Sequence, residues 1–141
     1  MAGSDPTLGP NSGYYDANTS RANVLLDLQT CSTNFVPGNA DTGPGVEKGY
    51  TWTTGSPGIV LLQIIVPPNS DKWKWSACRF GCVGCGADYG QYTNASSNHP
   101  GGVNAAMADG SARFFKSSIA MNTWWALGTK GDGEAISSDS Y

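Results

Sequence analysis

Residues 103–115 of the chain read VNAAMADGSARFF, which is two alternating runs separated by an Asp-Gly pair. Val103, Ala105 and Met107 alternate with the residues between them, and the run that ends at Phe115 alternates in the same way. An Asp-Gly pair between such runs is a strong hairpin signal, because a two-residue primed turn needs positive φ at both central positions. The sequence therefore predicts a β-hairpin that turns at Asp109-Gly110.

Two short helices are predicted on either side of this hairpin. The first is capped by Thr19 or Ser20 and runs through about Thr30. Its residues three or four apart, which we expect to share the face that packs on the core, are Ala22, Leu25, Leu26 and Gln29. The second is capped by Asn122, covers residues 123–127 and stops at Gly128 in the C′ position.

The longest apolar run in the chain is Ile59–Val66, interrupted only by Gln63 and followed by two prolines. Its β-branched content and its length predict a strand that is buried on both faces. Trp73 and Trp75 follow with a spacing of two, and we expect their rings in the core or at an interface.

Composition restricts the class of protein. The 141 residues include 19 glycines and 8 prolines, which predicts a β-rich fold with many turns in a single domain, residues 1–141, with a loop-rich N-terminus over residues 1–18. A formal net charge of −3 argues against a nucleic-acid partner. The first residues carry no export signal, and the run at 59–66 is far shorter than the roughly 20 residues that a membrane-spanning helix needs. As given, the chain is expected to be soluble, with no membrane span.

The four cysteines are Cys31, Cys78, Cys82 and Cys85. Two disulfides, in any of three pairings, are the simpler interpretation for a glycine-rich domain in an oxidising compartment. The alternative is a zinc ion held by four thiolates, or by three thiolates and His99. The single dense cysteine cluster matches no zinc-finger spacing, because a second cluster is missing.

His99 is followed by nine residues and then by Asp109-Gly110. This H-X9-DG spacing resembles the C-terminal signature of planctomycete-type prepilin-like proteins. The segment Val66-Pro67-Pro68-Asn69-Ser70 is similar to the Pro-Pro-Asn segment of that family. The resemblance is specific over residues 96–141 and extends back to about residue 20.

The resemblance implies a fold and a location. Its members resemble the major pseudopilins of type II secretion, so it implies an α+β fold: a small β-rich domain with an antiparallel sheet and a short N-terminal helix, a truncated form of the pilin fold. It also implies an extracytoplasmic location, in the periplasm or at the cell surface, with pilin-like or secretion-system proteins as partners. The hydrophobic leader helix of the family is missing from this sequence, which puts anchoring and polymerisation in doubt.

The same resemblance implies a calcium site in the C-terminal loop, residues 127–141. Three carboxylates occur there, and calcium prefers six to eight oxygen ligands from carboxylates and carbonyls. The expected ligands are Leu127, Lys130, Asp132, Glu134, Ser138 and Asp139. The alternative is an acidic, solvated tail that binds no ion.

His99 and Asp109 are the candidate catalytic residues. A ring hydrogen bond from His99 to a backbone carbonyl or to the Asp109 carboxylate is the structural interpretation, which we favour. The enzymatic alternative is a calcium-dependent hydrolase, in which the ion polarises a carbonyl or phosphoryl oxygen and His99 or a carboxylate activates water. Its substrate would be a small phosphodiester, ester or lactone. A third hypothesis is a carbohydrate-binding surface that exposes Trp52, Trp73, Trp75 and Tyr92.

Overall fold

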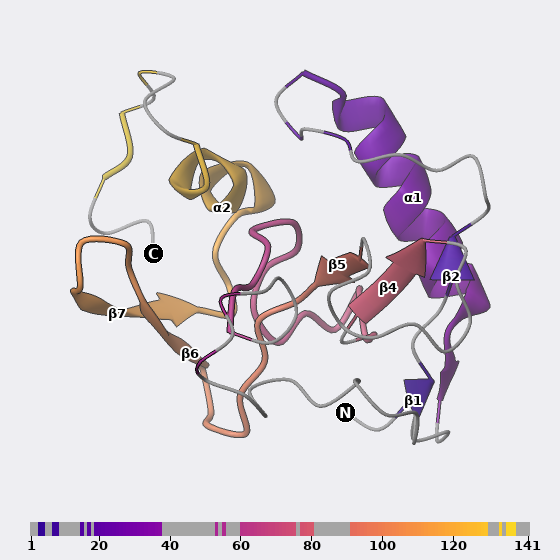
Figure 1. Ribbon diagram of the computed structural model, residues 1–141, viewed down its shortest axis with the longest axis horizontal. Helices are drawn as coiled ribbons and strands as arrows, with labels where there is room; N and C mark the ends of the chain where they lie inside the picture. The colour runs from indigo at the N-terminus through magenta and orange to yellow at the C-terminus, as the bar shows by residue number, and fades with distance from the viewer. Residues whose placement is uncertain are drawn as a thin grey trace.

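The computed structural model describes residues 3–4, 7–8, 15, 17, 19–37, 53, 55, 60–75, 77–80, 91–129, 133 and 135–137. These residues form a small α+β domain, as predicted (Figure 1). Its elements in chain order are β1 (Gly3–Ser4), β2 (Thr7–Leu8), α1 (Arg21–Asn34), β3 (Val36–Pro37), β4 (Ala77–Phe80), β5 (Gln91–Thr93), β6 (Gly102–Ala106), β7 (Ala112–Lys116) and α2 (Met121–Leu127).

The strands form three small sheets. β1 pairs antiparallel with β3. A three-stranded sheet has the order β2-β4-β5, in which β2 is parallel to β4 and β5 is antiparallel to it. β6 and β7 form a separate antiparallel hairpin. In Figure 1 the helix α1 lies beside β2 and β4, and the hairpin lies on the opposite side of the molecule, below α2.

Helix α1 begins after Ser20, as the sequence predicted, but it buries a different face. Its buried residues are Val24, Asp27, Leu28 and Cys31, whereas Leu25 is 40% exposed and Leu26 is 66% exposed. The face predicted from the spacing of Leu25 and Leu26 was therefore wrong. The rotation of the helix is set by a disulfide from Cys31 to Cys78 in β4 and by a hydrogen bond from Tyr92 to Asp27.

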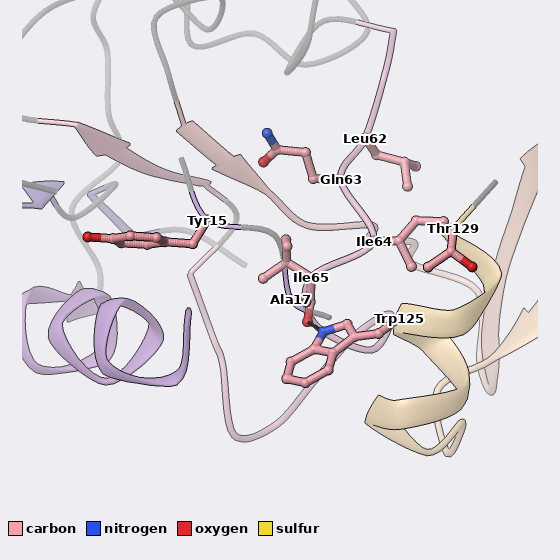
Figure 2. A pocket seen from close by; sticks show the side chains of 9 residues that line it. Tyr15, Ala17, Leu62, Gln63, Ile64, Ile65, Trp125 and Thr129 are labelled. Carbon is pink, nitrogen blue, oxygen red and sulfur yellow. Dashed lines mark hydrogen bonds between the residues drawn. The ribbon is translucent and has the colours of Figure 1, made fainter. Parts of the chain in front are cut away.

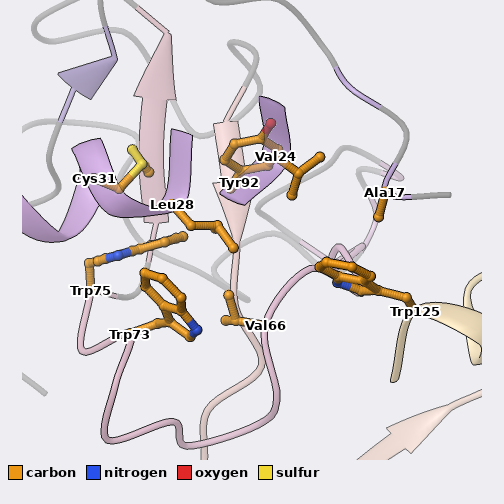
Figure 3. Close-up of a cluster of buried hydrophobic side chains, with 10 residues drawn as sticks. Ala17, Val24, Leu28, Cys31, Val66, Trp73, Trp75, Tyr92 and Trp125 are labelled. Atoms are coloured by element: carbon orange, nitrogen blue, oxygen red, sulfur yellow. A yellow bond between two sulfur atoms is a disulfide. The ribbon is translucent and has the colours of Figure 1, made fainter. Parts of the chain in front are cut away.

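The buried face of α1 packs on an aromatic core (Figure 3). Trp73, Trp75 and Tyr92 are 5%, 1% and 2% exposed, which confirms the core interpretation of the two tryptophans. The indole N–H of Trp75 donates to Ser32 Oγ on α1 at 3.2 Å. Because these three rings are buried, the hypothesis of an exposed carbohydrate-binding surface is wrong for them.

Residues 60–66 do not form the buried strand that was predicted. Val60, Leu61 and Leu62 are 41%, 54% and 38% exposed, and the chain bends before Val66, which is buried. Gln63 explains why the backbone pairing of this segment with β5 stops at this residue. Its N–H donates to Thr93 O at 3.1 Å, but its side-chain oxygen, in place of a main-chain carbonyl, accepts the N–H of Thr93 at 3.0 Å.

The predicted hairpin is present, with Val103 opposite Phe115 and Ala106 opposite Ala112. Its turn differs from the two-residue type. Gly110 N–H donates to Met107 O at 3.0 Å, Met107 N–H donates to Ser111 O at 2.8 Å, and Gly110 has φ +82°. This is a three-residue loop with glycine in the left-handed position, so Asp109 does not need the positive φ that was expected of it.

Helix α2 carries two adjacent tryptophans into two different clusters. Trp125 joins the core beside α1, whereas Trp124 packs edge-to-face on Phe115, with ring centroids 5.3 Å apart, in a second cluster behind the hairpin. The helix begins after Ala120 rather than at the predicted cap Asn122. Gly128 ends it with φ −86°, so no left-handed cap forms.

Packing at position 128 leaves little room for a side chain. A Cβ there would lie 3.2 Å from Ile64 Cβ, so Ile64 would have to shift by a few tenths of an ångström to admit it. Among the residues that the structure describes, neither helix has both the length and the apolar character needed to cross a membrane.

Candidate functional site

His99 lies in a loop between β5 and β6, at the open end of the hairpin. Its side chain is exposed, and its backbone N–H donates to Ser97 Oγ at 3.1 Å. The loop borders a polar pocket of about 430 Å³. The residues that line this pocket are Asn69, Ser96, Ser97, Asn98, His99, Pro100, Gly101 and Ser117.

Asn69 connects the Pro-Pro-Asn segment to this loop. It has φ +52°, the left-handed region that favours glycine and that asparagine tolerates better than most residues. Its Oδ1 accepts the N–H of Ser97 at 2.8 Å, its Nδ2 donates to Gly102 O at 3.4 Å, and its N–H donates to Ala95 O at 3.2 Å. The side chain of Asn69 therefore joins the Pro-Pro-Asn segment to the His99 loop, the two segments on which the resemblance rests. Spacing did not reveal this link, because 33 residues separate Asn69 from Gly102.

Asp109 lies at the other end of the hairpin from His99. β6 alone spans about 13 Å at 3.3 Å per residue, and it separates the two residues along the register from Gly102 to Ala106. Asp109 Oδ1 accepts from Ser111 N–H at 2.9 Å and from Ser111 Oγ at 2.6 Å. These bonds lower the pKa of the Asp109 carboxyl. The register of the hairpin therefore argues against the Asp109 partner for the His99 ring and against a site shared by the two candidate catalytic residues, whereas the hydrogen bond from the ring to a backbone carbonyl stays a prediction.

The cysteine pairing answers one question that the sequence left open. Cys31 and Cys78 form a disulfide with their Cα atoms 5.9 Å apart. Neither sulfur is then a thiolate, so both zinc alternatives lose ligands that they need. Cys82 and Cys85 lie outside the described residues, and so does Trp52.

The expected calcium ligands fall almost entirely outside the described residues. Leu127, the last residue of α2, is the exception and is half-buried. Lys130, Asp132, Glu134, Ser138 and Asp139 are not among the described residues. Within the described part of the chain, no group of three His, Cys, Asp or Glu side chains is placed to hold a metal ion. Calcium binding at this loop therefore stays a prediction.

Comparison with known proteins gives one match. Residues 32–122, well over half of the chain, match the sequence model of the family SBP_bac_10, which is described as a protein of unknown function (DUF1559). The chain belongs to the DUF1559 family. The DUF1559 match begins inside α1, directly after Cys31, and ends in the first turn of α2, so it contains Asn69, the His99 loop and the whole hairpin. No curated protein and no solved structure matches the chain.

A second depression in this DUF1559 protein lies beside α2 (Figure 2). It is a cleft of about 470 Å³ between α2 and the segment that precedes the two prolines. Its lining residues are Tyr15, Ala17, Leu62, Gln63, Ile64, Ile65, Trp125, Gly128 and Thr129. Sequence reasoning missed this cleft because it assigned residues 59–66 to a buried strand. In the sequence, the lining residues Leu62, Ile64 and Ile65 appear only as part of a hydrophobic run.

Proposed function

We propose that this DUF1559 protein is a pseudopilin-like globular domain with a structural or interaction role outside the cytoplasm, and that its C-terminal loop binds calcium. The observation that carries the proposal is the attachment of α1 to the sheet. A buried disulfide joins Cys31 on α1 to Cys78 in β4, beside the core tryptophans Trp73 and Trp75. A helix held in this way on a small sheet agrees with the architecture that the H-X9-DG resemblance implies.

The disulfide also supports the proposed location. Structural disulfides form and persist in oxidising compartments and are rare in a reducing cytosol. The periplasm or the cell surface satisfies this requirement. Pilin-like or secretion-system proteins are the proposed partners, on the strength of the resemblance.

The calcium part of the proposal rests on the chemistry of residues 127–141. Asp132, Glu134 and Asp139 are hard oxygen ligands of the type that calcium prefers, and Leu127, Lys130 and Ser138 would add carbonyl or hydroxyl oxygens. The start of the loop is well fixed, because Gly128 N–H donates to Trp125 O at 2.9 Å and Thr129 N–H to Ala126 O at 3.3 Å.

Thermal unfolding with and without calcium tests the proposal. We expect calcium at 100 times its Kd to stabilise the native state by about 2.7 kcal/mol, and EGTA to reverse the increase in melting temperature. Asp132→Asn should abolish the increase, whereas Asp71→Asn, at an exposed aspartate outside the loop, should retain it. If calcium gives no binding heat by calorimetry and no shift in melting temperature, the calcium site is wrong.

The hydrolase alternative depends on His99, whose side chain is open to solvent beside a polar pocket. Asp109 cannot serve this alternative as a neighbouring carboxylate, because it lies at the other end of the hairpin. Turnover of bis-p-nitrophenyl phosphate or of an acyl lactone would favour it only if EGTA and His99→Ala both abolished the activity. We expect no such turnover from a structural domain.

A further inference from the structure

The cleft beside α2 combines apolar walls with a volume suited to a small molecule. Its volume of about 470 Å³ lies within the 300–1,000 Å³ typical of small-molecule sites. Leu62, Ile64, Ile65 and Trp125 supply apolar surface, and Figure 2 shows the Trp125 ring beside Ile65. The chain just before Leu62 exposes further apolar side chains, since Val60 and Leu61 are 41% and 54% exposed.

Trp125 forms a fixed wall of the cleft. Its indole N–H donates to Ile65 O at 2.6 Å, so the ring is tied to the opposite wall. The ring is only 4% exposed. A ligand would meet a rigid surface, which lowers the entropic cost of binding.

A positive charge lies against this wall. The Arg21 guanidinium, at the exposed start of α1, is 5.0 Å from the centroid of the Trp125 ring. Within the described part of the chain, no carboxylate forms an ion pair with this guanidinium. Stacking on the indole holds the guanidinium near the cleft while leaving its N–H groups available to an anion.

Two side-chain oxygens of the lining are already engaged in hydrogen bonds. Gln63 Oε1 accepts the N–H of Thr93, and Thr129 Oγ1 donates to Ala126 O at 2.9 Å. These two oxygens are therefore not free to bind the hydroxyls of a ligand. The arrangement suits a hydrocarbon tail with one negative head group at Arg21.

We propose that this cleft binds a small amphipathic anion, an alkyl or aryl carboxylate, with its tail against Leu62, Ile64 and Trp125 and its head group at Arg21. None of these residues is a proposed calcium ligand, although Gly128 and Thr129, at the start of the C-terminal loop, also line the cleft. The test is made in EGTA, which removes calcium. Failure of the cleft proposal can then be distinguished from failure of the calcium proposal.

The fluorescent sulfonate 1-anilinonaphthalene-8-sulfonate is the probe, titrated into the full chain with Trp excitation. We expect one saturable site per chain, from which decanoate displaces the probe. Decyl maltoside, which has the same tail without the charge, should displace it at least about tenfold less effectively, because a hydrogen bond to a charged group is worth about 1.5–3 kcal/mol, or tenfold and more.

Variants with matched controls locate the site. Leu62→Asp should weaken probe and decanoate binding by about tenfold or more, whereas Leu26→Asp, at the more exposed leucine of α1, should leave both within about twofold. Arg21→Gln should weaken decanoate by about tenfold and leave decyl maltoside unchanged, whereas Lys74→Gln, at an exposed lysine outside the cleft, should change neither. Circular dichroism and melting temperature confirm that each variant is folded.

The proposal is overturned if the probe shows no saturable one-to-one binding. It is overturned equally if Leu26→Asp weakens binding as much as Leu62→Asp does, since the probe would then report general apolar surface. Equal affinity for decanoate in Arg21→Gln and in the unmodified chain would also reject it.

Discussion

Asp27 on the inner face of α1 is a buried carboxyl, 7% exposed, that accepts a hydrogen bond from Tyr92 Oη at 3.0 Å. Burial raises its pKa above the ordinary value, and the Tyr92 bond offsets this only in part. Burial and the Asp27 charge also raise the pKa of Tyr92, so the phenol stays a donor. The folded protein therefore binds the Asp27 proton more tightly than the unfolded chain does.

Stability should depend on pH in a direction set by that raised pKa. The contribution of Asp27 is fully present below the pKa of an unfolded aspartate and is lost as pH rises through the folded pKa. Asp27→Asn keeps an oxygen for Tyr92 and removes the ionisation. We expect its melting temperature, relative to the unmodified chain, to rise between pH 3.5 and pH 7. Asp71→Asn, at an exposed aspartate, is the control, and a parallel pH dependence in all three proteins would contradict this account.

Asn69 holds the Pro-Pro-Asn segment on the His99 loop through its side chain, in a left-handed conformation. Asn69→Ala loses both side-chain bonds and places a Cβ-bearing residue without local polar support at φ +52°, so we expect a loss of about 2–3 kcal/mol. Asn69→Gly loses the bonds but avoids the steric penalty, so it should cost less. Urea unfolding measures both, with Asn104→Ala in the exposed face of β6 as control. Equal losses in the two Asn69 variants would show that the conformation is not strained.

At the scale of elements, the sequence predicted which segments are regular better than how they are oriented. The hairpin followed from its alternation, and both helices were found near their true positions. The sequence did not predict the turn type, the buried face of α1 or the conformation of residues 60–66. The φ angle of Gly110 decides the turn type, the disulfide decides the buried face of α1, and the Gln63 side chain decides the conformation of residues 60–66. Each of these depends on contacts between residues far apart in the chain or on local geometry, and residue spacing reveals neither.

The hairpin turn allows a direct test. Gly110 has φ +82°, and a Cβ added there would meet no atom within 4 Å, so backbone strain alone determines the cost of a side chain. Gly110→Ala should destabilise the protein by about 1–2 kcal/mol. Gly55, which also has open space around it but no positive φ, is the matched control, and Gly55→Ala should change stability by less than about 0.5 kcal/mol. Denaturant midpoints that shift equally in the two variants would refute the turn assignment.

For the molecule as a whole, the Cys31–Cys78 bond links α1 to the three-stranded sheet across 47 residues of sequence. Loop-closure entropy for a loop of this length corresponds to about 4 kcal/mol. Cys31→Ala combined with Cys78→Ala should lower the free energy of unfolding by up to that amount, as measured in urea. A reductant should destabilise the unmodified chain by at least this amount and should have a smaller effect in the double variant, in which only Cys82 and Cys85 remain. An unchanged midpoint in the double variant would mean that packing alone positions α1.

The candidate sites were less predictable than the fold. His99 and Asp109 are separated by nine residues in the sequence, and β6 keeps them apart in the structure, because a fixed spacing along a hairpin does not bring its two ends together. The cleft beside α2 gave no sequence signal, since it is built from Tyr15, residues 62–65 and Trp125. The expected calcium ligands, apart from Leu127, are outside the described residues, so their arrangement stays a prediction.

The adjacent tryptophans of α2 have one more consequence. A single step along an α-helix turns it by about 100°, so Trp124 and Trp125 enter the two hydrophobic clusters from one short rigid rod. Unfolding of either cluster should therefore disturb α2 and, through α2, the other cluster. The two halves should accordingly share one cooperative transition, and a fluorescence signal from both indoles should disappear at a single temperature.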